Sequence, residues 1–316
     1  MPAFLKFRPI YQERVWGGRR LESFLGRKLP QGGPIGESWE MVDRPAAQSV
    51  VVSGQWAGLT MRELIKAHTE EIMGPGWPMD RPFPILVKWL DCRDRLSVQV
   101  HPPAQVAAGL GGEPKTENWY FAETDEGAAV YAGLRPGTTK ASFEAAIAAG
   151  TVDRCLERLA VREGDSLLIY SGTMHAIDAG NVILEIQQNS DTTYRVYDWG
   201  RVGLDGRPRT LHVRQSLACL EANTAPAPRL IRGDAAGEVL ARSPEFTLRR
   251  RRLGPGDRLD FAAGQQPRIL SVVDGALTGE SEVNRGDNVL LPRAGAFGFR
   301  TTRGATVLIT EDFIPT

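Results

Sequence analysis

The chain has 316 residues, a length that suggests two domains or one large domain with an insertion. It carries 38 Lys and Arg residues against 38 Asp and Glu residues, so the formal net charge is zero and no global field attracts a polyanion or a membrane surface. Hydrophobic residues at 42% and charged residues at 24% are typical of a folded globular protein and exclude a disordered chain. The 34 glycines and 21 prolines favour short strands joined by turns over an all-helical bundle.

The cysteines and the N-terminal residues indicate the cellular compartment. Cys92, Cys155 and Cys219 are widely spaced and form no CxxC motif, so we expect neither a disulfide framework nor a zinc knuckle. The N-terminal residues lack the apolar segment of a signal peptide, and no window approaches the ~18 apolar residues of a membrane span. We therefore expect a cytoplasmic protein that binds neither membrane nor nucleic acid. The sequence does not decide between a monomer and a homodimer.

Most of the predicted elements are short strands. In chain order, the sequence predicts a helix over 60–73, strands over 85–90 and 96–101, a helix over 142–159, strands over 166–170, 182–187 and 194–199, and a helix over 211–222. Further strands are predicted over 246–253, 268–273, 288–291 and 306–309. The helices follow from apolar residues at three- and four-residue spacing, and the strands from β-branched or aromatic runs bounded by turn residues. The chain is thus predicted to be mainly β.

A connector divides the chain. The periodicity stops at 224–228, where Pro226 and Pro228 favour an extended segment over a continued helix. We therefore expect one domain at 1–224 and a smaller one at 225–316.

The two parts share an internal repeat. A Gly-Asp turn, a strand and a second turn follow Gly164, in an order that resembles the second motif of the cupin barrels, G-x5-P-x-G-x2-H. Gly172 and His175 match that motif, and Tyr170 stands at its Pro position. The resemblance implies a cupin-like barrel that could hold a metal ion.

The second copy begins at Gly286 and retains Pro292, but Ala294 stands at the second Gly position and Phe297 at the His position. Taken together, the copies imply two cupin-like β-barrels of the jelly-roll type with a few added α-helices. The C-terminal barrel is expected to be a degenerate one that binds no catalytic metal.

Polar residues with ligand chemistry alternate along the strand predicted at 96–101. Ser97, Gln99 and His101 project from one face of it, because side chains alternate between the two faces of a strand. A neutral imidazole and an amide carbonyl two residues apart can chelate a cation from the same side. Taken alone, however, the pattern favours an exposed strand over a metal site.

Three other segments have the same mixed polar character: 115–120, 171–175 and 185–195. Strand periodicity allows Glu185 and Arg195 to point toward the same interior. Together these segments indicate a barrel interior that is lined with polar groups.

These motifs resemble type I mannose-6-phosphate isomerase in its short bacterial form. The resemblance rests on Gln99-Val-His101-Pro, Lys115-Thr-Glu117, Gly172-Thr-Met-His175-Ala and the stretch ending Tyr194-Arg195. It begins near Val15-Trp16-Gly-Gly18 and Gly36-Glu37-Ser-Trp-Glu40, and it continues to about Trp199.

The resemblance implies a zinc-dependent enzyme that interconverts D-mannose 6-phosphate and D-fructose 6-phosphate. The implied ligands of one Zn²⁺ ion per chain are Gln99, His101, Glu117 and His175. The implied catalytic residues are Arg195, Glu185 and Lys115, and the residues expected to bind substrate are Lys88, Ser97 and Trp16.

Physical chemistry supports this reading but leaves alternatives open. Two imidazoles, a carboxylate and an amide suit zinc, and a fixed cation stabilises the negative charge of an enediol. The proton carrier could be Glu185, Lys88, Lys115 or zinc-bound water. An isomerase or epimerase of an unphosphorylated sugar, a sugar-binding protein without turnover and a metal-dependent dioxygenase are the rival functions.

Several conspicuous residues have simpler explanations. His68 and His212 are expected at the surface or in packing, and Glu37 and Glu40 as turn residues. The four arginines at 249–252 split between two faces of a strand, which favours a solvated edge strand over a nucleic-acid site.

Overall fold

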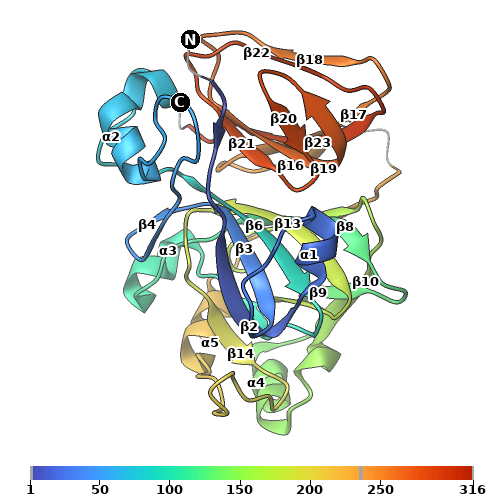
Figure 1. Ribbon diagram of the computed structural model, residues 1–316. Helices are drawn as coiled ribbons and strands as arrows, with labels where there is room; N and C mark the ends of the chain where they lie inside the picture. Colours follow the sequence, from blue (N-terminus) through green and yellow to red (C-terminus); the bar gives the residue numbers. More distant parts are fainter. Residues whose placement is uncertain (1–2, 235–237, 315–316) are drawn as a thin grey trace.

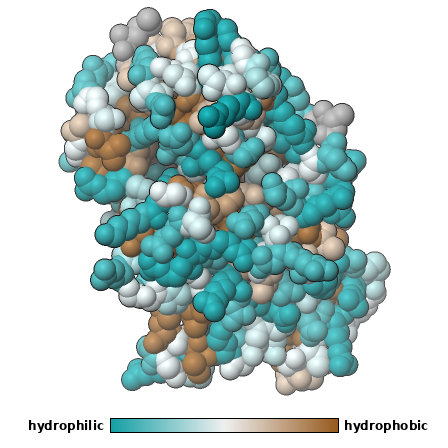
Figure 2. All heavy atoms as spheres, turned by 45° about the vertical axis from the view of Figure 1, so that its right-hand side comes forward, coloured by the Kyte–Doolittle hydropathy of each residue, from teal (hydrophilic) through white to brown (hydrophobic). Residues whose placement is uncertain are grey.

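The computed structural model describes residues 3–234 and 238–314, and it contains two β-rich lobes (Figure 1). Most strands of the first 200 residues lie in one lobe, and the orange-to-red strands of the C-terminal part dominate the other. The prediction of a mainly β chain with a few added helices is confirmed. Hydrophilic residues dominate the face shown in Figure 2, with hydrophobic ones interspersed among them.

Two antiparallel sheets build the first lobe. The seven-stranded sheet contains, in order across it, β15 (Leu230–Ile231), β11 (Ser166–Ile169), β8 (Glu117–Thr124), β13 (Asn181–Gln188), β6 (Ile85–Cys92), β3 (Ile35–Met41) and β2 (Ile10–Gly18). The five-stranded sheet contains β10 (Leu156–Ala160), β9 (Ala129–Leu134), β12 (His175–Ile177), β7 (Val98–Val100) and β14 (Tyr194–Tyr197). Both strand orders are open, so this lobe is a jelly-roll-like pair of sheets rather than one closed ring of strands. A separate small hairpin joins β4 (Asp43–Arg44) to β5 (Ala47–Gln48).

A nine-stranded sheet builds the second lobe. Its main path is β1 (Leu5–Lys6), β21 (Asn288–Leu291), β19 (Arg268–Thr278), β23 (Ala305–Glu311), β17 (Thr247–Leu253) and β16 (Val239–Arg242). The other three strands are β18 (Arg258–Phe261), β20 (Glu282–Asn284) and β22 (Phe297–Arg300).

The helices are short additions to these sheets. They are α1 (Arg20–Leu25), α2 (Met61–Ile72), α3 (Ala104–Ala107), α4 (Lys140–Ala149) and α5 (Val213–Glu221), with 3₁₀ turns at Ala108–Leu110 and Val152–Cys155. None of the helices in the described part of the chain is long and apolar enough to cross a membrane.

The helix predictions over 60–73 and 211–222 are confirmed, whereas the prediction over 142–159 is wrong beyond residue 149. α4 ends at Gly150, which adopts a left-handed conformation (φ 67°) and donates its N–H to Ala146 and Ile147 carbonyls. Glycine takes this conformation without steric cost, so it commonly ends helices. The residues that follow form a 3₁₀ turn and then β10.

Strand β6 shows how the fold places polar side chains inside the first lobe. All eight of its residues are buried, because both faces of the strand are covered. Ile85, Val87 and Trp89 pack into a core that extends to the second lobe. Lys88 and Leu90, on the opposite face, line a cavity. The alternation of a strand therefore turns Lys88 away from the shared core and into the cavity.

The internal repeat is present as structure. Gly164 and Gly286 both have positive φ (82° and 91°), and each opens a turn that leads into a strand. A second turn follows in each copy, and it leads into β12 at His175 and into β22 at Phe297. Phe297 is buried in the hydrophobic core of the second lobe.

Each lobe also takes a strand from the other part of the chain. β1 pairs with β21 of the C-terminal sheet, and β15 pairs with β11 of the first lobe. Residues 223–229 form no helix or strand, in keeping with the extended connector that was expected there. The division at 224/225 itself stays a prediction.

Candidate active site

A cavity of about 600 Å³ lies between the two sheets of the first lobe. The seven-stranded sheet contributes Lys88 from β6 and Glu185 from β13, and the five-stranded sheet contributes Gln99 from β7 and Arg195 from β14. The cavity lining includes seven of the residues predicted from the sequence: Trp16, Lys88, Ser97, Gln99, Lys115, Glu185 and Arg195. The structure thus brings these residues to one site.

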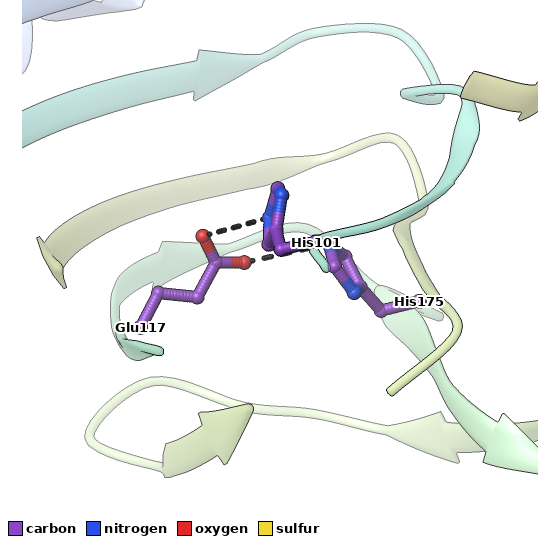
Figure 3. Close-up of side chains that lie close together, drawn as sticks. All are labelled: His101, Glu117 and His175. Atoms are coloured by element: carbon purple, nitrogen blue, oxygen red, sulfur yellow. Dashed lines mark ion pairs between the residues drawn. The ribbon is translucent and has the colours of Figure 1, made fainter. Parts of the chain in front are cut away.

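The remaining three predicted residues form a buried cluster (Figure 3). Glu117 Oε2 lies 3.3 Å from His101 Nε2, and Glu117 Oε1 lies 3.5 Å from His175 Nε2. One ligand atom from each residue lies within 4.8 Å of the others. Tetrahedral bonds of about 2.0–2.1 Å to a zinc ion place ligand atoms about 3.3 Å apart, which is close to the two distances between Glu117 and the histidines.

Backbone carbonyls orient both imidazoles. His101 Nδ1 lies 2.8 Å from the Thr192 carbonyl oxygen, and His175 Nδ1 lies 2.8 Å from that of Thr173. A carbonyl can only accept, so each Nδ1 must carry the proton and each Nε2 keeps its lone pair. Burial, together with the charge of Lys115, lowers the pKa of His101 to about 3. Both rings therefore present an unprotonated nitrogen to Glu117.

The cluster contains polar atoms that lack partners. Glu117 Oε1 and His175 Nε2 are buried, and neither makes a hydrogen bond with any described residue. Such groups are costly to bury unless something else satisfies them. A divalent cation would satisfy both, so the three residues could hold a metal ion.

Gln99 stands beside this cluster. It is opposite His175 in the register of β7 with β12, and opposite Arg195 in the register of β7 with β14. Gln99 thus lies between a cluster residue and the cavity arginine. Its role as a metal ligand stays a prediction.

Lys115 connects the cluster to the cavity. Its Nζ lies 2.6 Å from Glu117 Oε2, 3.3 Å from His101 Nε2 and 3.9 Å from Glu185 Oε1. The side chain is 6% exposed. If a metal cation bound to Glu117, the ammonium of Lys115 could still pair with Glu185.

Glu185 is surrounded by donors. Trp119 Nε1 donates to its Oε2 at 3.2 Å, and Lys88 Nζ lies 3.4 Å from its Oε1. Burial raises the pKa of Glu185 above its usual range, against the opposing charges of Lys115 and Lys88. A carboxylate whose pKa is raised is a better proton acceptor.

The structure corrects three of the simpler interpretations. The arginines at 249–252 lie on β17, which pairs with β16 on one side and β23 on the other and is therefore no edge strand. Glu37 is no turn residue: it lies on β3 and lines the cavity, where it accepts hydrogen bonds from Arg14 and from Trp39 Nε1. Glu40, also on β3, is buried in an ion pair with Arg27. Apolar residues alternate with polar ones over 35–41, which is typical of a strand. The glycines in and before this segment favour a turn instead, so the strand was not predicted.

His212 and Arg209 line the cavity as well, although sequence reasoning placed His212 at the surface or in packing and did not single out Arg209. His212 Nδ1 accepts a hydrogen bond from the Arg195 backbone N–H (3.2 Å). Neither residue belongs to a motif whose spacing could have revealed it.

Comparison with known proteins bears out the sequence resemblance. A family model described as the phosphomannose isomerase type I catalytic domain matches residues 4–134. The chain is 38% identical over 302 residues to the mannose-6-phosphate isomerase of Streptococcus mutans, with 92% of each chain covered. It is 35% identical over 303 residues to the mannose-6-phosphate isomerase ManA of Bacillus subtilis, covering 91% of this chain and 92% of the relative.

The chain belongs to the type I phosphomannose isomerase family. The crystal structure of the mannose 6-phosphate isomerase from Bacillus subtilis matches it with a TM-score of 0.82 at 29% identity, covering 98% of this chain and 100% of that one. The fold of this type I phosphomannose isomerase homologue, both lobes included, is therefore that of a solved isomerase. The roles of the individual site residues stay predictions.

The pKa of Glu37 can be tested through the pH dependence of the free energy of unfolding. Burial alone would raise its pKa, but Lys88 and Arg14 outweigh burial and hold the pKa at about 2, below the ordinary 4.5. A lowered pKa contributes stability above pH 4.5 that is lost as the pH falls toward 2. We expect the difference in unfolding free energy between the unmodified protein and Glu37→Gln to shrink by about 2 kcal/mol from pH 7 to pH 3. Urea unfolding of metal-free protein at both pH values measures it, and a constant difference would contradict the assignment.

Proposed function

We propose that the protein is a zinc-dependent aldose–ketose isomerase that interconverts D-mannose 6-phosphate and D-fructose 6-phosphate by proton transfer through an enediol. One observation carries the proposal: the unprotonated nitrogens of His101 and His175 converge on the buried carboxylate of Glu117, beside a cavity lined by charged side chains of both signs. Membership of the type I phosphomannose isomerase family supports the choice of substrate.

The proposed ligands of the zinc ion are Gln99, His101, Glu117 and His175. Two imidazoles and a carboxylate are typical of catalytic zinc sites, and an amide oxygen can complete the set. When bound there, a divalent cation would polarise the sugar carbonyl and stabilise negative charge on its oxygen. Lys115 would then turn its ammonium from Glu117 toward Glu185, which already lies within 3.9 Å.

Glu185 is the proposed base. It takes the proton from C2 of the open-chain aldose to form the enediolate, whose negative charge lies on O1. After a proton has moved from O2 to O1, it returns a proton to C1 to form the ketose. Lys88 and Trp119 hold the carboxylate in place, at 3.4 Å and 3.2 Å. Lys88 and Lys115 also supply N–H groups that can donate to the sugar oxygens as charge develops on them.

Arg195 is the proposed second cation of the transition state. It stands opposite the proposed ligand Gln99 in the strand register, which supports a role near the reacting carbons. Its Nε is buried and makes no hydrogen bond with any described residue. A guanidinium stays protonated at any working pH, so it can stabilise an enediolate at once.

Metal content and activity test the proposal directly. We expect elemental analysis to find one zinc ion per chain, and a coupled assay for fructose 6-phosphate to lose its signal after chelation and to recover it with added Zn²⁺. His101→Ala is expected to bind no zinc, whereas the half-buried His68 of α2 offers a control in His68→Ala, which should keep its zinc. Full activity in metal-free protein would overturn the zinc assignment.

Replacement of Arg195 tests its role in the transition state. We expect Arg195→Ala to lower kcat by roughly 10²–10³, as for the loss of one preorganised donor to a developing oxyanion, with the zinc content unchanged. A raised KM with normal kcat would instead indicate uniform binding. Arg268→Ala, in the second lobe, is the control for the loss of an ion-paired arginine and should leave kcat unchanged.

Isotope exchange tests the proton transfer. Starting from C2-deuterated substrate in water, we expect part of the deuterium to be lost to solvent, because an acid formed on the protein exchanges its proton. Glu185→Gln should abolish both turnover and this exchange while the zinc content is retained. Complete transfer of deuterium from C2 to C1 would favour a hydride shift. Undiminished exchange in Glu185→Gln would assign the base to a lysine or to zinc-bound water.

A further inference from the structure

We propose that Arg209 determines specificity for a phosphorylated sugar by binding the phosphate group, and that Asp198 is the positioning residue that holds Arg209 for this contact. The inference rests on the proposed function and deepens it: Arg209, on a loop, takes the distal dianion of the substrate, and Arg195 serves the reacting end.

The loop that carries Arg209 leaves strand β14 and returns to it. The chain departs after Tyr197 and comes back at 210–212, where three hydrogen bonds tie it to Arg195. Arg195 Nη1 donates to the Thr210 carbonyl (2.9 Å), the His212 N–H donates to the Arg195 carbonyl (2.7 Å), and the Arg195 N–H donates to His212 Nδ1 (3.2 Å). The backbone next to Arg209 is therefore fixed beside Arg195.

Asp198 fixes the Arg209 side chain from the opposite side. Arg209 Nε donates to Asp198 Oδ2 at 2.7 Å, and Arg209 Nη2 donates to Asp198 Oδ1 at 2.5 Å, while Arg201 Nη2 reaches Oδ1 at 2.8 Å. The Asp198 side chain is only 6% exposed. A bidentate pair of this kind orients the planar guanidinium strictly.

The pairing leaves the other edge of the Arg209 guanidinium for a ligand. Asp198 occupies the edge formed by Nε and Nη2, and Nη1 makes no hydrogen bond with any described residue. Arg209 lines the cavity, so this second edge is available to an anion there. Phosphate oxygens match the spacing of the guanidinium donors.

Arg195 and Arg209 occupy different positions along the cavity, which supports different roles in substrate binding. Arg195 lies on a strand, opposite the proposed ligand Gln99, whereas Arg209 lies on the loop beyond that strand. The phosphate of a hexose 6-phosphate is likewise remote from C1 and C2. Both cations line one cavity, so a dianion bound at this end would compensate their positive charge, and a neutral hydroxyl would not.

The other carboxylates at this end do not compete for Arg209. Asp191 and Asp205 line the cavity on exposed loops, and Asp205 Oδ1 accepts the Arg207 backbone N–H at 3.0 Å. Asp198 is the carboxylate that pairs with Arg209 among the described residues.

Steady-state kinetics with two substrates test the inference. We expect Arg209→Gln to raise KM for mannose 6-phosphate by about 10- to 100-fold, as for a lost charge-assisted contact, with kcat changed by less than about threefold. The kcat/KM for free mannose, which lacks the phosphate, should stay unchanged. Asp198→Asn should raise the same KM by about tenfold. An unchanged KM in Arg209→Gln, or an equal loss for both sugars, would overturn the inference.

A double variant separates positioning from general damage to the fold. If Asp198 acts through Arg209, Asp198→Asn combined with Arg209→Gln raises KM no further than Arg209→Gln alone, whereas independent structural effects would add. Glu311→Gln is the matched control, because Glu311 also accepts from two arginines, Arg249 and Arg268, in the second lobe. It should leave KM unchanged.

Phosphate binding without turnover distinguishes this inference from the proposed function. Inorganic phosphate should raise the Tm of the unmodified protein and should protect Arg209→Gln much less. If the unmodified protein shows this protection but no isomerase activity, the proposed function fails and the phosphate site stands. Isomerase activity with equal protection of both proteins would leave the proposed function intact and remove Arg209 from the phosphate site.

Discussion

A fully buried carboxylate, that of Glu117, constrains the centre of this structure. A lone buried carboxylate would cost several kcal/mol, so the surroundings must supply positive charge or ligand partners. They supply the ammonium of Lys115 at 2.6 Å and the two Nε2 atoms of His101 and His175 at 3.3 and 3.5 Å. Backbone carbonyls turn both imidazoles toward Glu117. Lys115 both contacts Glu117 and lines the cavity, so the cavity lies beside this cluster.

The second lobe supports the strand that begins with Glu117. Glu117 pairs with Ile169 of β11, and β11 follows the turn at Gly164. The Gly164 carbonyl accepts a hydrogen bond from Arg250 Nη1 on β17 of the second lobe (2.9 Å). The equivalent turn of the second lobe, at Gly286, accepts from Arg27 and from Trp89 of the first. Each repeated turn is thus held by the other lobe, which gives the C-terminal lobe a structural part in the site although Phe297 replaces its histidine.

Local patterns in the sequence predicted what depends on local structure. The alternation over 96–101 placed Ser97 and Gln99 on the cavity face, and the repeated Gly-Asp turns predicted matching segments in the two lobes. The helix predicted over 142–159 was too long because apolar periodicity continues past Gly150. The left-handed backbone conformation of Gly150 ends the helix there. Asp198 and Arg209 lie eleven residues apart, and only the return of a loop brings them together, so no spacing rule could have found the pair.

The charged side chains of the site alternate in sign from the cluster to the cavity rim. The order is Glu117, Lys115, Glu185, Lys88, Glu37 and Arg14. Two carboxylates flank Lys88, and their surroundings separate their pKa values. Arg14 binds Glu37 through two hydrogen bonds and helps to hold its pKa at about 2, whereas burial raises the pKa of Glu185, with Glu117 nearby adding to the effect. One carboxylate therefore remains a fixed anion and the other can take up a proton, which is the division that acid–base chemistry at neutral pH requires.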